Sequence, residues 1–176
     1  RGINMRYGPD GSVYVIDWYD RNACHRTNPE VWDRSNGRIY RISYGDCPPV
    51  KVDLENMTSL ELVKLLNHKN GWYGTMARRI LQHRGGNKEI WDAIDGLINT
   101  VDGREGVRSC LNYLWAMHVT GGFGGENPHA DLILDCPWEY VSAWSIQLEM
   151  EDGHASDDTL DQFETLAKES PFATDR

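Results

Sequence analysis

The pair Pro48-Pro49 divides the chain into two parts whose apolar residues repeat with different periods. Before this pair, apolar and polar residues alternate, as they do in strands that face a core on one side. From Thr58 onward, apolar residues recur every three or four positions, which is the period of amphipathic helices. Consecutive prolines can neither continue a strand ladder nor lie inside a helix. The sequence therefore predicts a mixed, mainly α chain, with a short β-sheet segment followed by helices.

Residues 1–46 are predicted to be all-β. The turn Gly8-Pro9-Asp10-Gly11 has a proline where turns need a fixed φ and a glycine where they need a permissive one. Strands are expected over 12–17 and 38–44, because both segments alternate and are rich in β-branched and aromatic residues. The loop between them is too long for a hairpin, and loops longer than about 12–15 residues in compact domains are usually functional or disordered. Residues 47–56 are predicted to be a linker.

Residues 57–176 are predicted to form pairs of helices. The expected helices cover 58–66, 72–83, 88–101, 104–119, 128–134, 137–150 and 160–168. A period of 33 residues places a small residue at one position in three of these helices: Ala77, Cys110 and Ala143. Such a repeat is typical of an α-solenoid of HEAT-like helix pairs, in which small residues let neighbouring helices approach closely. The alternative is an irregular helical bundle.

The net charge of −9 is concentrated in the last third of the chain, where residues 122–176 carry 13 acidic and 2 basic residues. An acidic balance argues against nucleic-acid binding, because neutralising phosphates requires clustered Lys and Arg. The chain has no recognisable signal peptide, and no apolar run approaches the roughly 18 residues that a membrane helix needs. We therefore expect no nucleic-acid partner and no direct membrane span.

The segment 17–38 holds the candidate functional residues. His25 is a candidate general base that Asp20 or Asp33 can orient, and His25 and Asp20 are the candidate catalytic residues. Asp17 and Arg38 are the candidate cofactor-binding residues, because a carboxylate suits Ca²⁺ and a guanidinium suits an anionic group. The same side chains can instead pair with one another and stabilise a long loop, so both interpretations stay open. The loop has further candidates of the same kind: Asn22, Arg26, Asn28, Glu30, Asp33, Arg34 and Asn36.

The sequence Cys24-His25 is not a site of covalent haem attachment. Such attachment needs Cys-x-x-Cys-His, and Arg21 stands where the first cysteine is required. The four cysteines of the chain also lack the spacing of metal ligands. Cys24 and Cys47 can form a disulfide in an oxidising compartment, whereas Cys110 is expected to be a buried thiol.

Three motifs carry a resemblance to a known family: YGPDGSVYV at 7–15, DWYD at 17–20 and NGRIYRI at 36–42. Together they resemble a late blade of the β-propeller in the large membrane-bound dehydrogenases of planctomycetes and related bacteria. That propeller is similar to the soluble quinoprotein glucose/sorbosone dehydrogenases. In the family it is followed by HEAT-like repeats and then by a haem-binding cytochrome c domain with Cys-x-x-Cys-His. The resemblance covers residues 3–46 and, less specifically, residues 50–170.

The resemblance implies a secreted or periplasmic protein that oxidises a sugar-like substrate and passes electrons to a c-type haem domain. It implies a PQQ-like quinone, Ca²⁺ and c-type haem as cofactors of the whole protein, none of them held by this chain alone. The implied partners are the chain's own upstream propeller blades and a downstream cytochrome c domain. No independent catalysis is expected, because the substrate cavity requires the other blades. The alternative is a non-catalytic scaffold, in which a ligand-binding propeller is joined to a HEAT-like solenoid that docks a protein partner.

Overall fold

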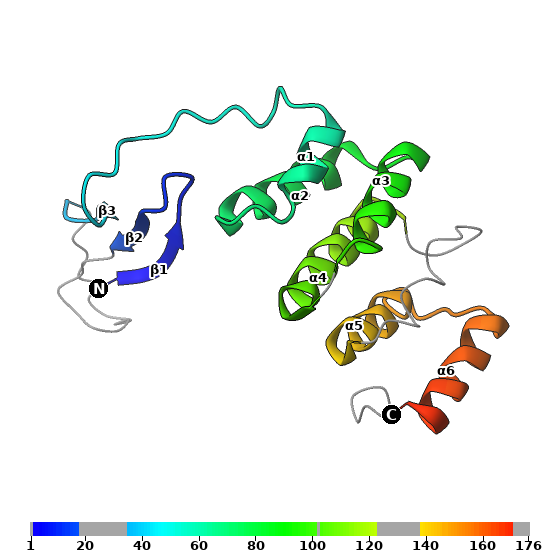
Figure 1. The fold of residues 1–176 in the computed structure, drawn as a ribbon. Helices are drawn as coiled ribbons and strands as arrows, with labels where there is room; N and C mark the ends of the chain where they lie inside the picture. Colours follow the sequence, from blue (N-terminus) through cyan, green and yellow to red (C-terminus); the bar gives the residue numbers. More distant parts are fainter. Residues whose placement is uncertain (1, 18–34, 102, 123–137, 171–176) are drawn as a thin grey trace, which may run out of the picture. The chain divides into compact units, whose positions relative to one another are not determined.

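A computed structural model of the chain describes residues 2–17, 35–101, 103–122 and 138–170 (Figure 1). The chain forms two compact units, Arg1–Asp53 and Leu54–Arg176. The boundary between the units falls inside the segment 47–56 that the sequence predicts to be a linker. In the part of the chain that the structure describes, the first unit has three strands and the second has six helices. This confirms the prediction of a mainly helical chain with a small antiparallel sheet.

The three strands form an antiparallel sheet in the order β1-β2-β3: β1 is Gly2–Tyr7, β2 is Val13–Asp17 and β3 is Ile39–Ile42. In the turn between β1 and β2, the Gly11 amide donates to the Gly8 carbonyl at 3.1 Å. Gly11 has a φ of 80°, a conformation that favours glycine at this position. In β1 the pairing is irregular between Gly2 and Met5, and Asn4 has a φ of 68° there. Strands β2 and β3 lie within one or two residues of the predicted segments.

One face of the sheet is apolar and exposed. Paired residues lie on the same side of a sheet, and residues along a strand alternate between its two sides. The register therefore collects six side chains on one face: Met5, Tyr7, Val13, Val15, Tyr40 and Ile42. Five of these are exposed, from 37% for Val13 to 70% for Met5. No described apolar side chain of the three strands is fully buried.

The second unit is built from short helices with regular ends. Their bounds are α1 Ser59–Leu65, α2 Gly71–Arg84, α3 Lys88–Ile98, α4 Gly103–Val119, α5 Glu139–Glu149 and α6 Asp157–Glu169. Thr58 and Glu61 form a capping box at α1: the Glu61 amide donates to Thr58 Oγ1 at 3.3 Å, and the Thr58 amide donates to Glu61 Oε2 at 2.7 Å. Asn70, Asn87 and Ser156 cap α2, α3 and α6. Helix α2 ends where the sequence predicts, at Gly85, which has a φ of 75°.

Helices α2 and α4 pack side by side and run in the same direction. Just before α2, Asn67 Oδ1 accepts a hydrogen bond from Nδ2 of Asn112, in the middle of α4, at 2.9 Å. Just after α2, the Gly86 amide donates to the carbonyl of Thr120, one residue beyond α4, at 3.0 Å. Helices α1 and α3 pack against each other, α1 also contacts α2, and α3 also contacts α4.

Helix α5 continues this arrangement on the other side of α4, again in the same direction. Trp138, the residue before α5, lies against Gly106 near the start of α4. Beyond the end of α5, Glu151 Oε2 lies 2.6 Å from Nε2 of His118, in the last turn of α4. Between these ends, the unit buries a core of apolar side chains: Leu62, Val63, Leu66, Ala77, Ile80, Leu81, Ile90, Ile94, Cys110, Tyr113, Leu114, Ala116, Met117 and Val141.

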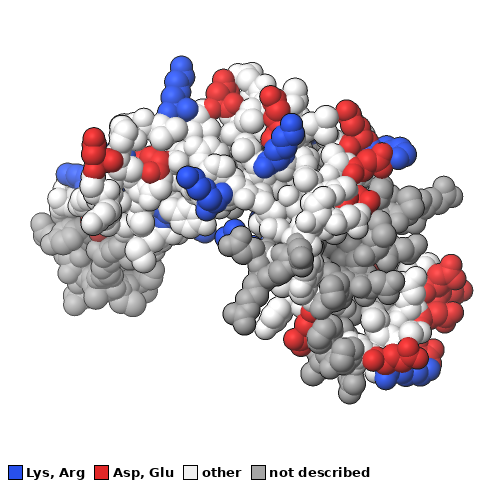
Figure 2. Space-filling model, viewed as in Figure 1, with Lys and Arg blue, Asp and Glu red and all other residues white. Residues whose placement is uncertain are grey.

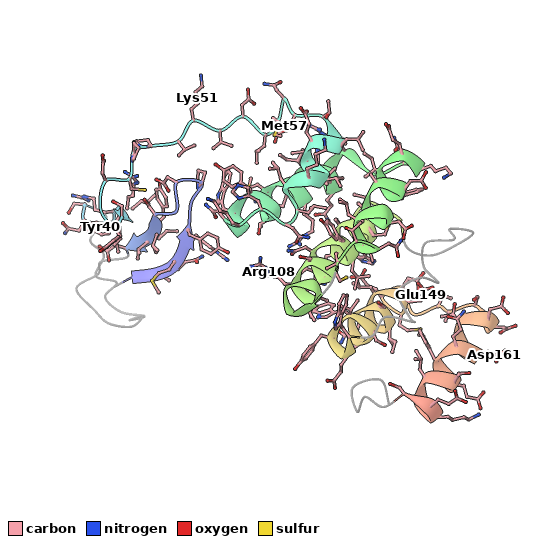
Figure 3. All side chains as sticks on the ribbon, in the orientation of Figure 1. Tyr40, Lys51, Met57, Arg108, Glu149 and Asp161 are labelled. Carbon is pink, nitrogen blue, oxygen red and sulfur yellow. The ribbon has the colours of Figure 1, made fainter. Side chains whose placement is uncertain are left out.

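Arg84 ties the end of α2 to the segment that precedes α1. Its Nη1 donates to the carbonyl of Met57 at 2.8 Å, and its Nη2 donates to the carbonyl of Glu55 at 2.7 Å. Met57 lies in the turn that leads into α1 (Figure 3). Leu54 nearby is buried. The helical unit therefore begins before its first helix, with residues that the sequence predicts to be linker.

The repeat predicted from the sequence has a small residue in each of three helices: Ala77, Cys110 and Ala143. Ala77 and Cys110 are buried, as expected of small residues between helices. Ala143 is half-buried, and Ser142 and Ser145 are buried beside it on α5. Trp138 lies just before α5, whereas Trp72 lies inside α2. The predicted helix at 128–134 lies outside the described residues.

Several of the acidic residues in the last third of the chain lie on α6. This helix presents exposed acidic side chains on its surface (Figure 2): Asp157, Asp158, Asp161, Glu164 and Glu169. Lys168 forms an ion pair with Glu164 one turn earlier. Two acids stand in the first turn and one lysine in the last, which suits the dipole of the helix. This arrangement is that of a solvated helical surface.

Candidate functional site

Two of the four predicted site residues belong to the part of the chain that the structure describes. Asp17 is the last residue of β2, and Arg38 immediately precedes β3. Asp20 and His25 lie outside the described residues. The structure therefore bears on the two candidate cofactor-binding residues, and the two candidate catalytic residues stay predictions.

The sheet brings Asp17 and Arg38 together through their backbones. The Asp17 amide donates to the Arg38 carbonyl at 2.8 Å, which extends the pairing of β2 with β3 by one step. The Arg38 side chain turns back on its own segment: its Nη1 donates to the carbonyls of Ser35 and Gly37, each at 3.0 Å. These contacts hold the guanidinium beside the chain that enters β3. Arg38 is exposed, so the rest of its planar donor surface remains accessible from solvent.

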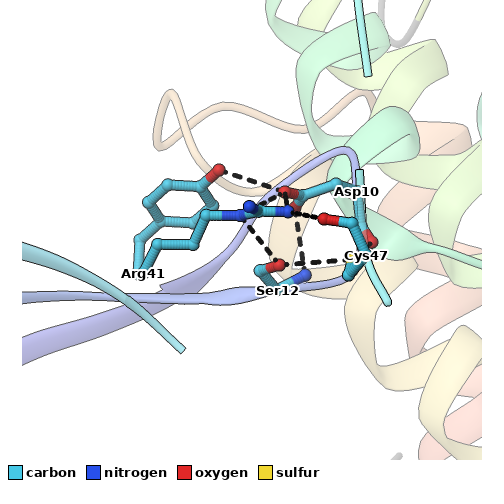
Figure 4. A network of polar contacts seen from close by, with 5 residues as sticks. Asp10, Ser12, Arg41 and Cys47 are labelled. Carbon is cyan, nitrogen blue, oxygen red and sulfur yellow. Dashed lines mark hydrogen bonds and ion pairs between the residues drawn. The ribbon is translucent and has the colours of Figure 1, made fainter. Parts of the chain in front are cut away.

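A polar network that the sequence analysis did not single out is centred on Asp10 (Figure 4). The side chain of Asp10 is only 2% exposed. Its Oδ1 accepts a hydrogen bond from the Ser12 amide at 3.0 Å, which closes the turn before β2. Its Oδ2 accepts hydrogen bonds from Nε of Arg41 at 2.8 Å and from the Tyr14 hydroxyl at 3.2 Å. Both oxygens of the carboxylate are therefore used inside the protein.

Arg41 and Cys47 extend the network to the segment that leaves the sheet. Arg41 donates through Nε to Ser12 Oγ at 3.1 Å and through Nη2 to the carbonyl of Cys47. Cys47 is a free thiol whose Sγ donates to the carbonyl of Asp10 at 3.0 Å and lies 3.4 Å from Ser12 Oγ. Cys24, the other cysteine of the disulfide that the sequence allows, lies outside the described residues. The network joins the first turn, β3 and residue 47.

The charges in this network stabilise each other. Burial by itself would raise the pKa of Asp10, but the hydrogen bonds from the Ser12 amide, Arg41 and Tyr14 outweigh burial and hold the pKa below its ordinary value. Burial by itself would lower the pKa of Arg41, but the hydrogen bond to Asp10 and the negative charge of Asp10 raise it. Both shifts keep the pair ionised. The network is thus suited to fixing the turn and the end of β3, and it offers no spare carboxylate oxygen to a ligand.

A second group of interacting side chains links helices α2, α4 and α5 of the helical unit. The guanidinium carbon of Arg78, on α2, lies 5.2 Å from the ring centroid of Trp115, on α4. Trp115 in turn contacts Trp144, on α5, edge to face, with ring centroids 5.4 Å apart. Partial burial lowers the pKa of Arg78. Trp144 remains 38% exposed and Tyr140, one turn earlier on α5, is 63% exposed, so this row ends in exposed aromatic side chains.

The described residues do not assemble a metal site or a membrane helix. Within the ranges that the structure covers, no three His, Cys, Asp or Glu side chains lie close enough together to hold a metal ion. No described helix is both long enough and apolar enough to cross a bilayer.

Comparison of the chain with protein-family models, with curated proteins and with solved structures finds no significant match.

Proposed function

We propose that this chain is part of a secreted or periplasmic dehydrogenase that oxidises a sugar-like substrate and passes the electrons to a c-type haem domain. The sheet supplies one wall of a β-propeller, and the helices form a spacer between the propeller and the haem domain. The chain has no independent catalysis in this proposal. Three kinds of support are the motif resemblance over residues 3–46, the order of a sheet followed by helices, and the uncovered apolar face of the sheet.

The apolar face is the observation that carries the proposal. Complete burial of a large apolar side chain stabilises a protein by roughly 1.5–3 kcal/mol, so a face with six such side chains is costly to leave in water. In a β-propeller, each antiparallel blade packs face to face against its neighbours. Strands β1, β2 and β3, antiparallel in chain order, match the connectivity of such a blade. In the blade interpretation, the neighbouring blade buries Tyr40 and Ile42, which are 49% and 58% exposed here.

We also propose that the helical unit is a solenoid of HEAT-like pairs. In a solenoid, equivalent helices of successive repeats run parallel and contact each other at equivalent positions. Helices α2, α4 and α5 run in the same direction side by side. The pair His118–Glu151 joins residues 33 positions apart, which is the period of the sequence repeat. An irregular bundle has no reason to show this agreement.

In this proposal the segment 17–38 lines the propeller cavity. Asp17 and Arg38 bind cofactor, Asp17 as a Ca²⁺ ligand and Arg38 as a donor to an anionic quinone. His25 is the general base, and Asp20 orients it. The backbone hydrogen bond from Asp17 to Arg38 supports a shared role, because it fixes the two residues at the same end of the sheet.

The first test is the open reading frame on both sides of the chain. We expect further blades with Gly-Pro-Asp-Gly turns upstream and a Cys-x-x-Cys-His motif downstream. If neither is found, the dehydrogenase proposal is abandoned. The second test is titration of the complete protein with Ca²⁺ and with a quinone, followed by calorimetry and by dye-linked sugar oxidation. Asp20→Ala and His25→Ala should abolish turnover, whereas Asp46→Ala, which removes an exposed carboxylate outside the segment, should not.

The second candidate function is a non-catalytic scaffold whose helices dock a protein partner. The exposed aromatic residues at the end of the Arg78–Trp115–Trp144 row favour it. The two candidates differ in the complete protein: the scaffold predicts no quinone binding and no haem motif. It also predicts that Trp144→Ala abolishes binding of the partner protein. The parent protein and the variant should both lack redox activity in this case.

A further inference from the structure

Arg78, on α2, is a half-buried cation whose side chain has no hydrogen bond or ion pair within the described residues. Its guanidinium lies over the ring of Trp115, on α4. Arg84, on the same helix, shows the usual arrangement, because it donates to the carbonyls of Glu55 and Met57. Arg78 therefore keeps N–H donors that no oxygen of the described chain accepts.

This environment is unfavourable for a positive charge. Burial lowers the pKa of Arg78, and no charge among the described residues offsets the burial, whereas Asp10 does so for Arg41. An aromatic ring attracts a cation but does not accept hydrogen bonds as an oxygen does. A carboxylate does both, since it accepts two parallel hydrogen bonds from one guanidinium. The surroundings of Arg78 are therefore complementary to an anion.

The helices that carry this row do not provide the anion from their middle turns. Helix α2 contains three arginines and no acidic residue. Helix α4 has no acidic residue from Gly106 onward, and α5 has only Glu139 and Glu149, at its two ends. A carboxylate that binds Arg78 therefore comes from outside these three helices.

The other end of the row suits an apolar side chain. Trp115 contacts Trp144, which is 38% exposed, and Tyr140, one turn earlier on the same helix, is 63% exposed. Tryptophan, tyrosine and arginine are the residue types enriched at protein interfaces. We propose that the Arg78–Trp115–Trp144 row binds an acidic segment of a partner protein. A carboxylate of that segment binds Arg78, and a neighbouring apolar side chain packs on Trp144 and Tyr140.

A protein segment fits this row better than a nucleic acid does. Nucleic-acid binding requires clustered Lys and Arg, but α5 has no basic residue and Arg84 already donates to two carbonyls of the chain. The inference rests on the second candidate function and adds the chemistry of the partner. All its residues lie in the helical unit. A failed binding test therefore refutes this inference and leaves the test of the dehydrogenase proposal, in the flanking reading frame, unaffected.

The test measures binding of synthetic peptides to the 176-residue chain. A labelled peptide of alternating glutamate and leucine is titrated with the chain and followed by fluorescence anisotropy. We expect saturable binding that weakens with added salt, and binding about tenfold weaker when every glutamate is replaced by glutamine. Absence of binding, equal binding of the glutamine peptide, or tighter binding of a single-stranded oligonucleotide overturns the proposal.

Two adjacent arginines separate a specific site from a general effect of charge. Arg78→Gln and Arg79→Gln each remove one positive charge from α2, but only Arg78 lies over Trp115. Arg78→Gln should weaken binding of the glutamate peptide about tenfold, and Arg79→Gln, at an exposed position, by less than about twofold. Circular dichroism of the free variants checks that both keep the helix content of the parent chain. Equal losses in the two variants, or no loss in Arg78→Gln, refute the site.

A measurement on the parent chain keeps the proposal testable if Arg78→Gln does not fold. The indole N–H resonances of Trp115 and Trp144 should shift when the glutamate peptide is added. The indole resonance of Trp91, whose Nε1 donates to Thr120 Oγ1 at 3.2 Å, is the internal control and should not shift. Unchanged resonances of Trp115 and Trp144, or an equal shift of Trp91, would place the peptide elsewhere and overturn the proposal.

Discussion

Two helical glycines should respond in opposite ways to replacement by alanine, and the sign of each effect tests the packing of the helical unit. Gly96, in α3, is exposed, and a Cβ built on it meets no atom within 4 Å. In a helix, alanine is more favourable than glycine by about 1 kcal/mol. The variant Gly96→Ala should therefore raise the free energy of unfolding by up to that amount.

Gly74, in α2, is buried where α2 passes the end of α1. A Cβ there would lie 2.5 Å from the carbonyl oxygen of Leu66 and 3.2 Å from its carbonyl carbon. Both are backbone atoms and cannot rotate away, so α1 and α2 would have to move apart. Overpacking costs about 1–3 kcal/mol, and the helical preference of alanine recovers up to about 1 kcal/mol. We expect Gly74→Ala to lower the free energy of unfolding by about 1–2 kcal/mol.

The assay is urea unfolding followed by circular dichroism of the helices, with the midpoint and slope fitted for each variant. Helix content in the absence of urea should be the same in both variants and in the parent chain. The comparison is independent of the sheet, because both glycines belong to the helical unit. If Gly74→Ala stabilised the chain as much as Gly96→Ala does, the close approach of α1 to α2 would be refuted.

Three further predictions concern the core, a helix cap and the polar network. Leu114 is fully buried among α4 and α5 side chains, so Leu114→Ala should lower the free energy of unfolding, measured in urea, by about 3–5 kcal/mol. Leu160, on α6, is 49% exposed, so the control variant Leu160→Ala should lower it far less. Thr58→Ala removes the cap of α1 and should cost about 1 kcal/mol in the same assay, whereas the exposed Thr75 should tolerate alanine. Asp10 has a lowered pKa in the folded chain, so its contribution to stability is present above the ordinary carboxyl pKa of about 3.9 and is lost as pH falls through the folded value. The Ser12 amide resonance should report this transition below the ordinary pKa, and Asp10→Asn should abolish it; a transition at or above the ordinary value would contradict the network.

The local features of the fold could be predicted from the sequence because they depend on near neighbours. Pro48-Pro49 separates strands from helices, and Gly85 ends α2 with the positive φ that it was expected to supply. The inward face of α5 could not be predicted from the motif alone: Ser142 and Ser145 are buried there, whereas Ala143 is half-buried. Where a helix begins decides which residues face inward, and that depends on tertiary packing as much as on the motif.

The polar network shows why part of a site escapes sequence reasoning. Asp10 and Ser12 are two residues apart, and an Asp before a Ser in a turn is a local signal for the hydrogen bond that they form. Arg41 donates to the carboxylate of Asp10, and Cys47 donates to the backbone carbonyl of Asp10. These two residues lie 31 and 37 positions further along the chain. Only the register of β2 with β3, which pairs Tyr14 with Arg41, brings them there. A register is a tertiary property, and no motif in the sequence encodes it.

The two units obtain their stability from different sources, and this difference bears on where function lies. The helical unit buries side chains such as Leu62, Leu81 and Leu114 completely within itself. The sheet unit is joined chiefly by the hydrogen bonds of its ladder and by the network at Asp10, while its largest apolar side chains face water. A three-stranded sheet needs a covered hydrophobic face for independent stability. We therefore predict that the backbone pairing of Asp17 with Arg38, at the end of this sheet, is stabilised by whatever packs against the apolar face.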